Sequence, residues 1–254
     1  MKTVARISIS PVKGFRLSHP DEVELGPDGV AVNRRFFLVG PDGQRLRSSR
    51  TPWPVRVRAD YDAERERLRM ELPDGQEVEG DASALGAAIH SRSGTLDQTG
   101  RVVEGPWEGP LSELAGHPVR LVREDVSGSG LNEPVTLVSD GSLARLAAEV
   151  GEEVDSRRFR MLFELEGCKT HEEDTWEGRL FAIGDAAVRV GGPVARCAVT
   201  TRDPDTGEPD LDTLRVIKSY RGQRPSDGAI LFGVYCQVVE PGRVRIGDPV
   251  RALG

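Results

Sequence analysis

Residues 68–79 read LRMELPDGQEVE, and this short stretch indicates the fold class of the protein. Apolar and charged side chains alternate on either side of a Pro-Asp-Gly tripeptide, whose glycine supplies the positive φ that such a turn needs. Two alternating segments joined by a tight turn are typical of an antiparallel hairpin with one face in water. Residues 36–47, FFLVGPDGQRLR, repeat the pattern. Residues 4–9 and 54–58 alternate in the same way, so we expect an N-terminal antiparallel β domain.

The composition fits a turn-rich globular chain and excludes several classes of protein. Its 254 residues include 29 glycines and 17 prolines, which favours short strands over long helices. The net charge of −7 argues against a nucleic-acid-binding protein, and no apolar run is long enough to span a membrane. The first residues lack the apolar segment of a signal peptide, and the three widely spaced cysteines make neither a disulfide framework nor a zinc motif. We therefore expect a cytoplasmic protein that binds neither nucleic acid nor a membrane.

The second half of the chain is predicted to be mostly β with a few short helices. Ser139 or Asp140 is expected to cap a helix whose apolar side chains recur with helical spacing up to Gly151. A second helix is expected around residues 211–217. The other apolar runs predict strands at residues 135–138, 159–165, 180–183, 187–190, 194–200, 230–239 and 243–246.

A domain boundary is expected near residue 100. Residues 86–110 are rich in small polar side chains and show little periodicity, which favours a connecting segment. We therefore divide the chain into residues 1–100, an antiparallel β domain, and residues 101–254, a second β domain. Residues 127–130, SGSG, predict a flexible loop without the lysine of a phosphate-binding Walker loop.

Cys197 differs from the other two cysteines in its neighbours. Cys168 and Cys236 have the surroundings of small buried hydrophobes, the usual state of a free cysteine. Cys197 follows Arg196, and a guanidinium beside a thiol favours the thiolate, which attacks electrophiles and binds metals. On composition alone, an inert core position remains the commoner outcome for such a residue.

The basic residues are a second indication of chemistry. All but four of the 34 are arginine, a bias that fits genome composition but also suits bidentate binding of phosphate or carboxylate. The basic residues beside predicted strands are Lys13, Arg34, Arg35, Arg157, Arg158 and Arg160. They either converge on an anionic ligand or are ordinary surface side chains of strands, and the two interpretations are about even.

Residues 196–207, RCAVTTRDPDTG, resemble the core signature of the MOSC domain, a family named for the C-terminal domain of molybdenum cofactor sulfurases. The resemblance is greatest to the branch that contains the mitochondrial amidoxime reducing component and its bacterial relatives. Further segments match in the family's order: residues 10–14 (SPVKG), 34–39 (RRFFLV), 139–143 (SDGSL), 158–160 (RFR), 173–176 (EDTW), 183–185 (IGD), 219–221 (SYR), 232–235 (FGVY) and 244–250 (VRIGDPV). Essentially the whole chain is covered. The resemblance implies an N-terminal β-barrel-type domain followed by a MOSC-type β-barrel.

The resemblance also implies a molybdenum cofactor, in which a pterin dithiolene holds the metal. The family's conserved cysteine ligates molybdenum, so Cys197 is the expected metal ligand and catalytic residue. By motif position, the residues expected to bind the rest of the cofactor are Lys13, Arg35, Ser139, Ser142, Arg160 and Arg196. Asp174 or Asp203 is expected to deliver protons near the metal.

The implied function is an oxidoreductase that reduces N-hydroxylated or N-oxide small molecules by two electrons. The chain has no ferredoxin-type cysteine run, so we expect a separate electron donor: a ferredoxin, a flavodoxin or a cytochrome b5-like reductase system. The alternative is a sulfur carrier that holds a persulfide on Cys197 for sulfuration of the cofactor or of a metal-sulfur cluster. A third class is a non-catalytic binder of the cofactor or of a small anion.

The sequence departs from the family's pattern at two places. Gly14 stands where the family has serine, so a hydroxyl contact is lost or replaced by a backbone N–H. Met161 and Leu162 stand where the family has proline and asparagine. Because a leucine side chain neither donates nor accepts a hydrogen bond, we expect altered contacts at this end of the pocket.

Overall fold

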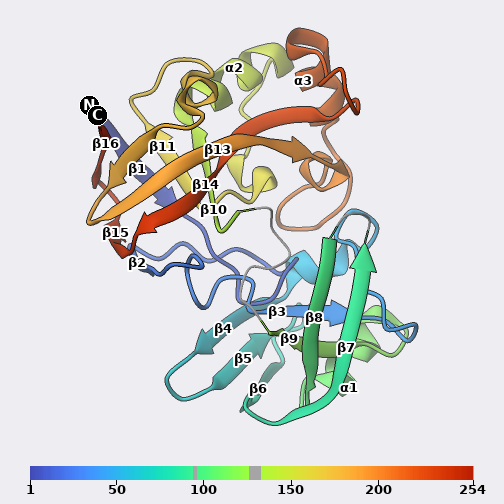
Figure 1. Cartoon of the computed structure of the whole chain (residues 1–254). Helices are drawn as coiled ribbons and strands as arrows, with labels where there is room; N and C mark the ends of the chain where they lie inside the picture. The colour runs from blue at the N-terminus through green and yellow to red at the C-terminus, as the bar shows by residue number, and fades with distance from the viewer. Residues whose placement is uncertain (94–95, 126–132, 254) are drawn as a thin grey trace.

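The computed structural model describes residues 1–93, 96–125 and 133–253, and within these ranges the chain is mostly strands with three short α-helices. Figure 1 shows two groups of sheets, a closed barrel above and a pair of smaller sheets below. We call them the barrel and the sheet domain. The predicted fold class, two β domains with few helices, is confirmed. The loop expected at residues 127–130 lies outside the described residues.

Among the described residues, seven strands close the barrel in the order β1, β11, β10, β14, β13, β12, β16. Their bounds are β1 (Lys2–Ile7), β10 (Val135–Ser139), β11 (Phe163–Glu166), β12 (Leu180–Ile183), β13 (Ala186–Arg196), β14 (Ile230–Glu240) and β16 (Pro249–Leu253). Fully buried side chains such as Val4, Phe163 and Val188 fill the interior, so the barrel is a packed core. The small sheet of β2 (Glu22–Leu25) and β15 (Gly242–Arg245) lies beside it.

The long pair of β13 and β14 positions the residues that matter for function. Its ladder shifts register between Val190 and Pro193 and again between Pro193 and Ala195. Such irregularities bend a strand and increase its local twist. β13 ends at Arg196, and the short 3-10 helix η4 (Ala198–Thr201) begins almost at once. This abrupt ending leaves residue 197 outside the ladder.

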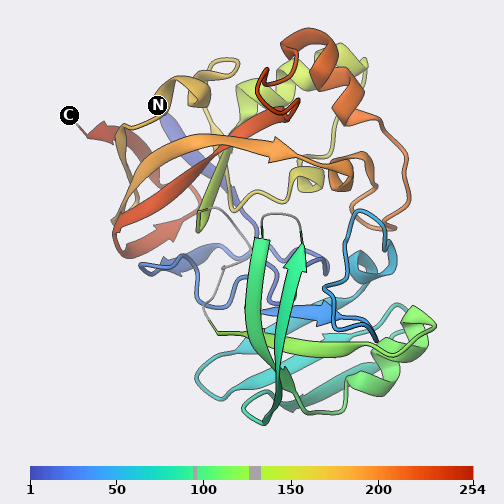
Figure 2. The ribbon, with the colours of Figure 1, turned by 45° about the vertical axis from the view of Figure 1, so that its right-hand side comes forward.

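The sheet domain consists of a four-stranded sheet, in the order β3, β9, β8, β7, and a three-stranded sheet, in the order β4, β5, β6. Its strands are β3 (Phe36–Val39), β4 (Arg58–Asp62), β5 (Arg67–Glu71), β6 (Glu77–Asp81), β7 (Leu85–Ser93), β8 (Leu96–Val103) and β9 (Arg120–Glu124). Figure 2 shows the hairpin of β7 and β8 rising towards the barrel. Buried Phe36, Leu68 and Trp107 belong to its core. The hairpin predicted from residues 68–79 is confirmed as β5 and β6.

Residues 86–110 are not the connecting segment that the sequence suggests. β7 and β8 lie within them and pair along most of their length, and α1 (Glu108–Ala115) follows. Small and polar side chains interrupt the apolar alternation of these strands, although Val102 and Val103 are buried in the core. Conversely, residues 44–47 form no strand and contribute one isolated bridge, between Val39 and Arg45.

The sheets do not divide the chain at residue 100. β1 and β2 come first in the sequence, yet β1 closes the barrel and β2 pairs with β15. β9 lies beyond residue 100, yet it pairs with β3 and β8 of the sheet domain. The sheet domain, residues 36–124, is therefore inserted between the first strand of the barrel and the rest of it.

The helix predicted at residues 140–150 is confirmed at both ends as α2 (Asp140–Val150). The Ser139 hydroxyl accepts a hydrogen bond from the Ser142 N–H at 3.1 Å, and Gly151 ends the helix with a φ of 90°. α3 (Thr213–Arg221) begins two residues later than expected. Figure 1 shows α2 and α3 together over one side of the barrel, where Leu146 and Ile217 are buried. Within the described ranges, no α-helix combines the length and the apolar character needed to cross a bilayer.

The loop after η4 connects the barrel to the sheet domain. The Arg202 guanidinium donates to the Ser49 carbonyl oxygen and to the Gly207 carbonyl oxygen, each at 2.7 Å. Gly207 has a φ of 78°, and a Cβ atom there would overlap the carbonyl group of Pro52. A side chain at residue 207 would therefore push the loop after η4 away from Pro52 of the sheet domain.

We predict that Gly207→Ala destabilises the protein much more than Gly43→Ala. Gly43 also has a positive φ, of 72°, but a Cβ there would meet no atom within 4 Å. Gly43→Ala should therefore cost only the backbone strain, about 1 kcal/mol, and Gly207→Ala about 3 kcal/mol or more because the Pro52 contact is lost as well. Urea unfolding of both variants measures the difference. Equal costs would contradict the close approach of residue 207 to Pro52.

Candidate functional site

A cavity of about 370 Å³ lies where the sheet domain meets the barrel. This volume is within the usual range for sites that take small molecules and cofactors. One wall comes from the loops before and after β3 and from the segment after β1, with residues 13–14, 34 and 45–49. The opposite wall comes from the barrel, with Thr136, residues 158–161, residues 194–200 and Tyr235. The cavity therefore depends on both domains.

Cys197 stands on the barrel wall of this cavity, and its side chain is exposed. The preceding residue, Arg196, also lines the cavity, but its guanidinium is held by backbone oxygens. The Arg196 guanidinium donates to the carbonyl oxygens of Phe232 at 2.7 Å and Phe159 at 3.0 Å, and it lies over the Phe159 ring. Burial lowers the pKa of Arg196 to about 10. Arg196 thus fixes the end of β13 and leaves the Cys197 thiol free to face the cavity.

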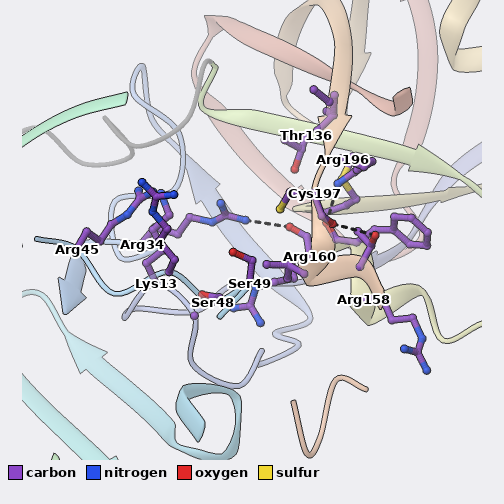
Figure 3. A pocket seen from close by; sticks show the side chains of 18 of the residues that line it. Lys13, Arg34, Arg45, Ser48, Ser49, Thr136, Arg158, Arg160, Arg196 and Cys197 are labelled. Atoms are coloured by element: carbon purple, nitrogen blue, oxygen red, sulfur yellow. Dashed lines mark hydrogen bonds between the residues drawn. The ribbon is translucent and has the colours of Figure 1, made fainter. Parts of the chain in front are cut away.

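Positive charge dominates the lining of the cavity. The basic side chains on its walls are Lys13, Arg34, Arg45, Arg47, Arg158, Arg160 and Arg196, and no aspartate or glutamate among the described residues lines it. Figure 3 shows Lys13, Arg34 and Arg45 on one side, with Cys197 and Arg196 on the other. On an acidic chain, this concentration of cations marks a place for an anion.

The cations nearest the middle of the cavity are held by carbonyl oxygens. Arg34 donates to the carbonyl oxygen of Arg160 at 3.0 Å, and Arg160 donates to that of Phe15 at 2.7 Å. Burial, with repulsion from Arg34, lowers the pKa of Arg160 to about 9. Burial also holds the pKa of Lys13 well below its usual range, and the charges of Arg45 and Arg34 add to the effect. A bound anion would relieve this repulsion.

Arg34 and Arg160 also share an unusual backbone conformation. Both have positive φ, 55° and 51°, which is uncommon for residues other than glycine. Such strain persists where the surrounding structure enforces it, and it is frequent at functional sites. Here the strained backbone directs two guanidinium groups into the same cavity.

The structure brings four of the residues expected from the sequence to this cavity: Lys13, Arg160, Arg196 and Cys197. Arg35 does not line it, because its guanidinium turns to the Glu124 carbonyl oxygen at 3.0 Å. The preceding Arg34 takes the place at the cavity wall. The cavity lining also includes five residues that were not predicted from the sequence: Arg45, Arg47, Ser48, Thr136 and Tyr235. For the first three, the available signal is the polar run that follows the Gly43 turn.

Ser139 and Ser142 lie in a separate buried cluster and not on the cavity wall. Their hydroxyls donate to the two carboxylate oxygens of Glu173, each at 2.6 Å. Ring contacts join His171 of this cluster to Phe232, and Phe232 stacks on Phe159 of the cavity wall. Ser139 and Ser142 therefore support the cavity wall from behind.

The two aspartates expected to deliver protons also lie outside the cavity lining. Asp174 forms an ion pair with Arg221 at 2.5 Å. Asp203 accepts hydrogen bonds from the N–H groups of Asp205 and Thr206 within its own turn. Unlike the two aspartates, Tyr235 lines the cavity, and burial raises the pKa of its phenol.

The structure accounts for both departures from the expected motifs. A Cβ atom on Gly14, which has a φ of 95°, would lie 2.7 Å from the Ser48 hydroxyl oxygen. Ser48 thus supplies a hydroxyl where residue 14 has no side chain. Leu162 is buried in the barrel core, and its N–H donates to the Thr136 hydroxyl at 2.9 Å. Thr136 and Met161 face the cavity instead of residue 162.

Comparison with known proteins matches both parts of the chain to known families. Residues 1–102 match the MOSC N-terminal beta barrel domain, and residues 124–251 match the MOSC domain. The chain is 39% identical to mitochondrial amidoxime reducing component 2 of Homo sapiens, over 98% of this chain and 82% of that protein. It is 39% identical to the component 2 protein of Rattus norvegicus over 98% and 82%, and 33% identical to amidoxime-reducing component 1 of Mus musculus over 99% and 82%.

We predict that the effects of Gly14→Ala and Ser48→Ala on stability are not additive. In the parent protein, Gly14→Ala brings a methyl group against the Ser48 hydroxyl and also strains the backbone. In a Ser48→Ala background only the strain remains, so the cost of Gly14→Ala should fall by about 1 kcal/mol. Urea unfolding of the two single variants and the double variant measures this coupling. Additive costs would mean that the Ser48 hydroxyl does not occupy the space beside Gly14.

We also predict that the buried cluster makes stability depend on pH. Burial, with repulsion from Arg221, lowers the pKa of His171 to about 4. Between pH 6.5 and 4 the unfolded chain therefore binds a proton that the folded protein refuses, and stability falls as pH falls. From pH 6.5 to 5 the loss should be about 1 kcal/mol, allowing for partial exposure of the ring. His171→Asn retains a residue that tolerates the positive φ at this position, and it should flatten the pH slope of the unfolding free energy. An unchanged slope would contradict the assignment.

Proposed function

The chain belongs to the MOSC family, with the family's N-terminal β-barrel domain ahead of the MOSC domain, and on that premise we propose a molybdenum-cofactor-dependent reductase of N-hydroxylated or N-oxide compounds. The relatives named as amidoxime-reducing components support this class of substrate. The observation that carries the proposal is an exposed thiol, Cys197, facing a cavity lined by cations and by no carboxylate of the described residues.

The donor set of the cavity fits such a cofactor. A phosphomonoester dianion needs fixed cations and hydroxyls, and a metal held by a dithiolene accepts a soft thiolate. The cavity offers both kinds of group on facing walls. Lys13, Arg34 and Arg160 would hold the phosphate and the pterin, with the hydroxyls of Ser48 and Thr136, and Cys197 would bind the metal.

When bound, the cofactor supplies a metal that exchanges two electrons and accepts an oxygen atom from the substrate. The net reduction of an N-hydroxyl group consumes two electrons and two protons and releases water. Arg196 keeps the end of β13 fixed, so that Cys197 is held in one place against the cavity. Tyr235 holds a proton on its phenol oxygen at the cavity wall because burial disfavours the phenolate.

Ser139, Ser142 and Arg35 support the site from outside the cavity in this proposal. The two serines hold Glu173 behind the Phe159 and Phe232 rings. Arg35 fixes β3 to the end of β9 through the Glu124 carbonyl oxygen. A separate electron-transfer protein, of the ferredoxin, flavodoxin or cytochrome b5-like type, would supply the electrons.

A sulfur carrier is the second candidate, and the exposure of Cys197 favours it as well. An exposed thiol is accessible to a persulfide donor, whereas the other cysteines are less suited to this role. Cys236 is buried, and burial raises the pKa of Cys168 to about 12. The basic cavity argues for the reductase, because persulfide transfer does not require a lining of cations.

The test compares wild type with Cys197→Ser, each made in a host that synthesises the molybdenum cofactor. Wild type should contain molybdenum and reduce an aromatic N-hydroxyamidine with an artificial electron donor. Cys197→Ser should reduce the turnover by about 100-fold or more, because the metal loses its protein thiolate. Metal analysis and turnover are measured on the same samples.

Cys168→Ser is the matched control and should leave both molybdenum content and turnover unchanged. Intact-mass analysis of the wild type distinguishes the second candidate. A persulfide on Cys197 in a protein without molybdenum would select the sulfur carrier and reject the reductase.

A further inference from the structure

We propose that Arg45 and Arg47 form a subsite for an anionic group on the substrate, so that the protein acts preferentially on N-hydroxylated or N-oxide compounds that carry a carboxylate or a phosphate. This inference rests on the proposed function and extends it from the type of bond reduced to the class of molecule. It concerns the run of residues 45–49, which follows the Gly43 turn and lines the wall facing Cys197.

The first observation is that the proposed cofactor contacts use only some of the cations that line the cavity. Arg158 is neutralised by Asp210, with 2.6 Å between guanidinium and carboxylate atoms. The cations proposed to hold the phosphate and pterin are Lys13, Arg34 and Arg160. Arg196 is held by the carbonyl oxygens of Phe159 and Phe232, which leaves Arg45 and Arg47, both on the sheet-domain wall. Two neighbouring cations repel each other, and a ligand anion between them removes that repulsion.

The second observation is how Arg45 is held. Its guanidinium donates to the side-chain oxygen of Gln98, and the Gln98 amide donates to the buried carboxylate of Glu124. Gln98 thus stands between the cation and a carboxylate that would otherwise pair with it directly. This arrangement fixes the orientation of the guanidinium while most of its N–H groups stay available to a ligand.

Arg45 lies on the wall of the cavity opposite Cys197 (Figure 3). Among neighbouring charges, the Glu124 carboxylate acts on Arg45 most strongly, followed by Arg47 on its own segment and by the Cys197 thiol across the cavity. Burial lowers the pKa of Arg45, so the protein holds this cation in a partly desolvated place. A substrate whose N–O group lies near Cys197 would therefore carry its far end towards Arg45.

Arg47 completes the subsite at the mouth of the cavity. Its side chain is exposed and forms no ion pair or hydrogen bond with the described part of the chain. A planar guanidinium fits a carboxylate or a phosphate through two parallel hydrogen bonds. Two such groups, one half-buried and one exposed, suit an anion that enters from solvent and is then partly desolvated.

The experiment uses three probes of the same shape: benzamidoxime, its 4-carboxylate and its 4-phosphonate. Binding to the protein from a cofactor-producing host is measured by isothermal titration calorimetry, and kcat/KM is measured separately with an artificial electron donor. Wild type should prefer at least one anionic probe by about tenfold or more over the neutral one, as expected for a charge-assisted hydrogen bond. The gain should appear in Kd and KM rather than in kcat, and it should shrink at high salt.

Arg45→Gln and Arg47→Gln should each reduce the preference, and the double variant should abolish it. Arg50→Gln is the matched control, because Arg50 is an exposed arginine on the same loop that does not line the cavity. It should keep the preference of the wild type. Equal binding of the three probes to wild type, or a preference that survives in the double variant, would overturn the subsite.

The two readouts separate this inference from the proposed function. Reduction of all three probes with no preference in binding would reject the subsite and leave the reductase intact. A binding preference that depends on Arg45 and Arg47, in a protein that reduces none of the probes, would support the subsite and reject the reductase.

Discussion

The site depends on one kind of interaction, a buried guanidinium held by a peptide carbonyl oxygen. Arg196 uses the carbonyl groups of Phe159 and Phe232, Arg160 uses that of Phe15, and Arg34 uses that of Arg160. A carboxylate in these places would cancel the charge, whereas a neutral oxygen satisfies the donors and leaves the charge in the cavity. The bonds of Arg34 and Arg160 also join the barrel to the segment that precedes the sheet domain. These two cations therefore help to hold that segment against the barrel.

Backbone irregularity makes that arrangement possible. Register shifts interrupt the ladder of β13, so that the chain leaves the barrel at residue 197. Gly233 on β14 has a φ of 72°, and a Cβ there would contact the Leu137 carbonyl oxygen and the Met161 side chain. The absence of that Cβ keeps room beside the Arg196 guanidinium. Regular strands would have built a closed barrel with no cavity at its rim.

The fold could be predicted from the sequence where side chains dictate local structure. The hairpin at residues 68–79 and the helix from Asp140 to Gly151 carry alternation, turn glycines and a capping serine, so both were within reach. β7 and β8 were not, because they carry few apolar side chains and pair with their neighbours, β7 with β8 and β8 with β9. The division of the chain near residue 100 stays a prediction, and no local pattern shows that β1 closes the barrel against β16.

For the site, motif resemblance located the neighbourhood but not the direction of each side chain. Lys13, Arg160, Arg196 and Cys197 meet at the cavity as the motifs suggest. Whether Arg34 or Arg35 faces it depends on the strained φ of Arg34, which no residue pattern reveals.

The closure of the barrel by β1 and β16 has a consequence for synthesis of the chain. Residues 36–124 hold every strand of the sheet domain, so this part has its complete set of partners while the chain is still growing. The first strand of the barrel must wait for residues 163–166 for one partner and for residues 249–253 for the other. Long-range pairing of this kind is slow to form. The wall that carries Cys197 is therefore completed after the wall that carries the cations of the sheet domain. A ligand that contacts both walls can bind only once both have formed.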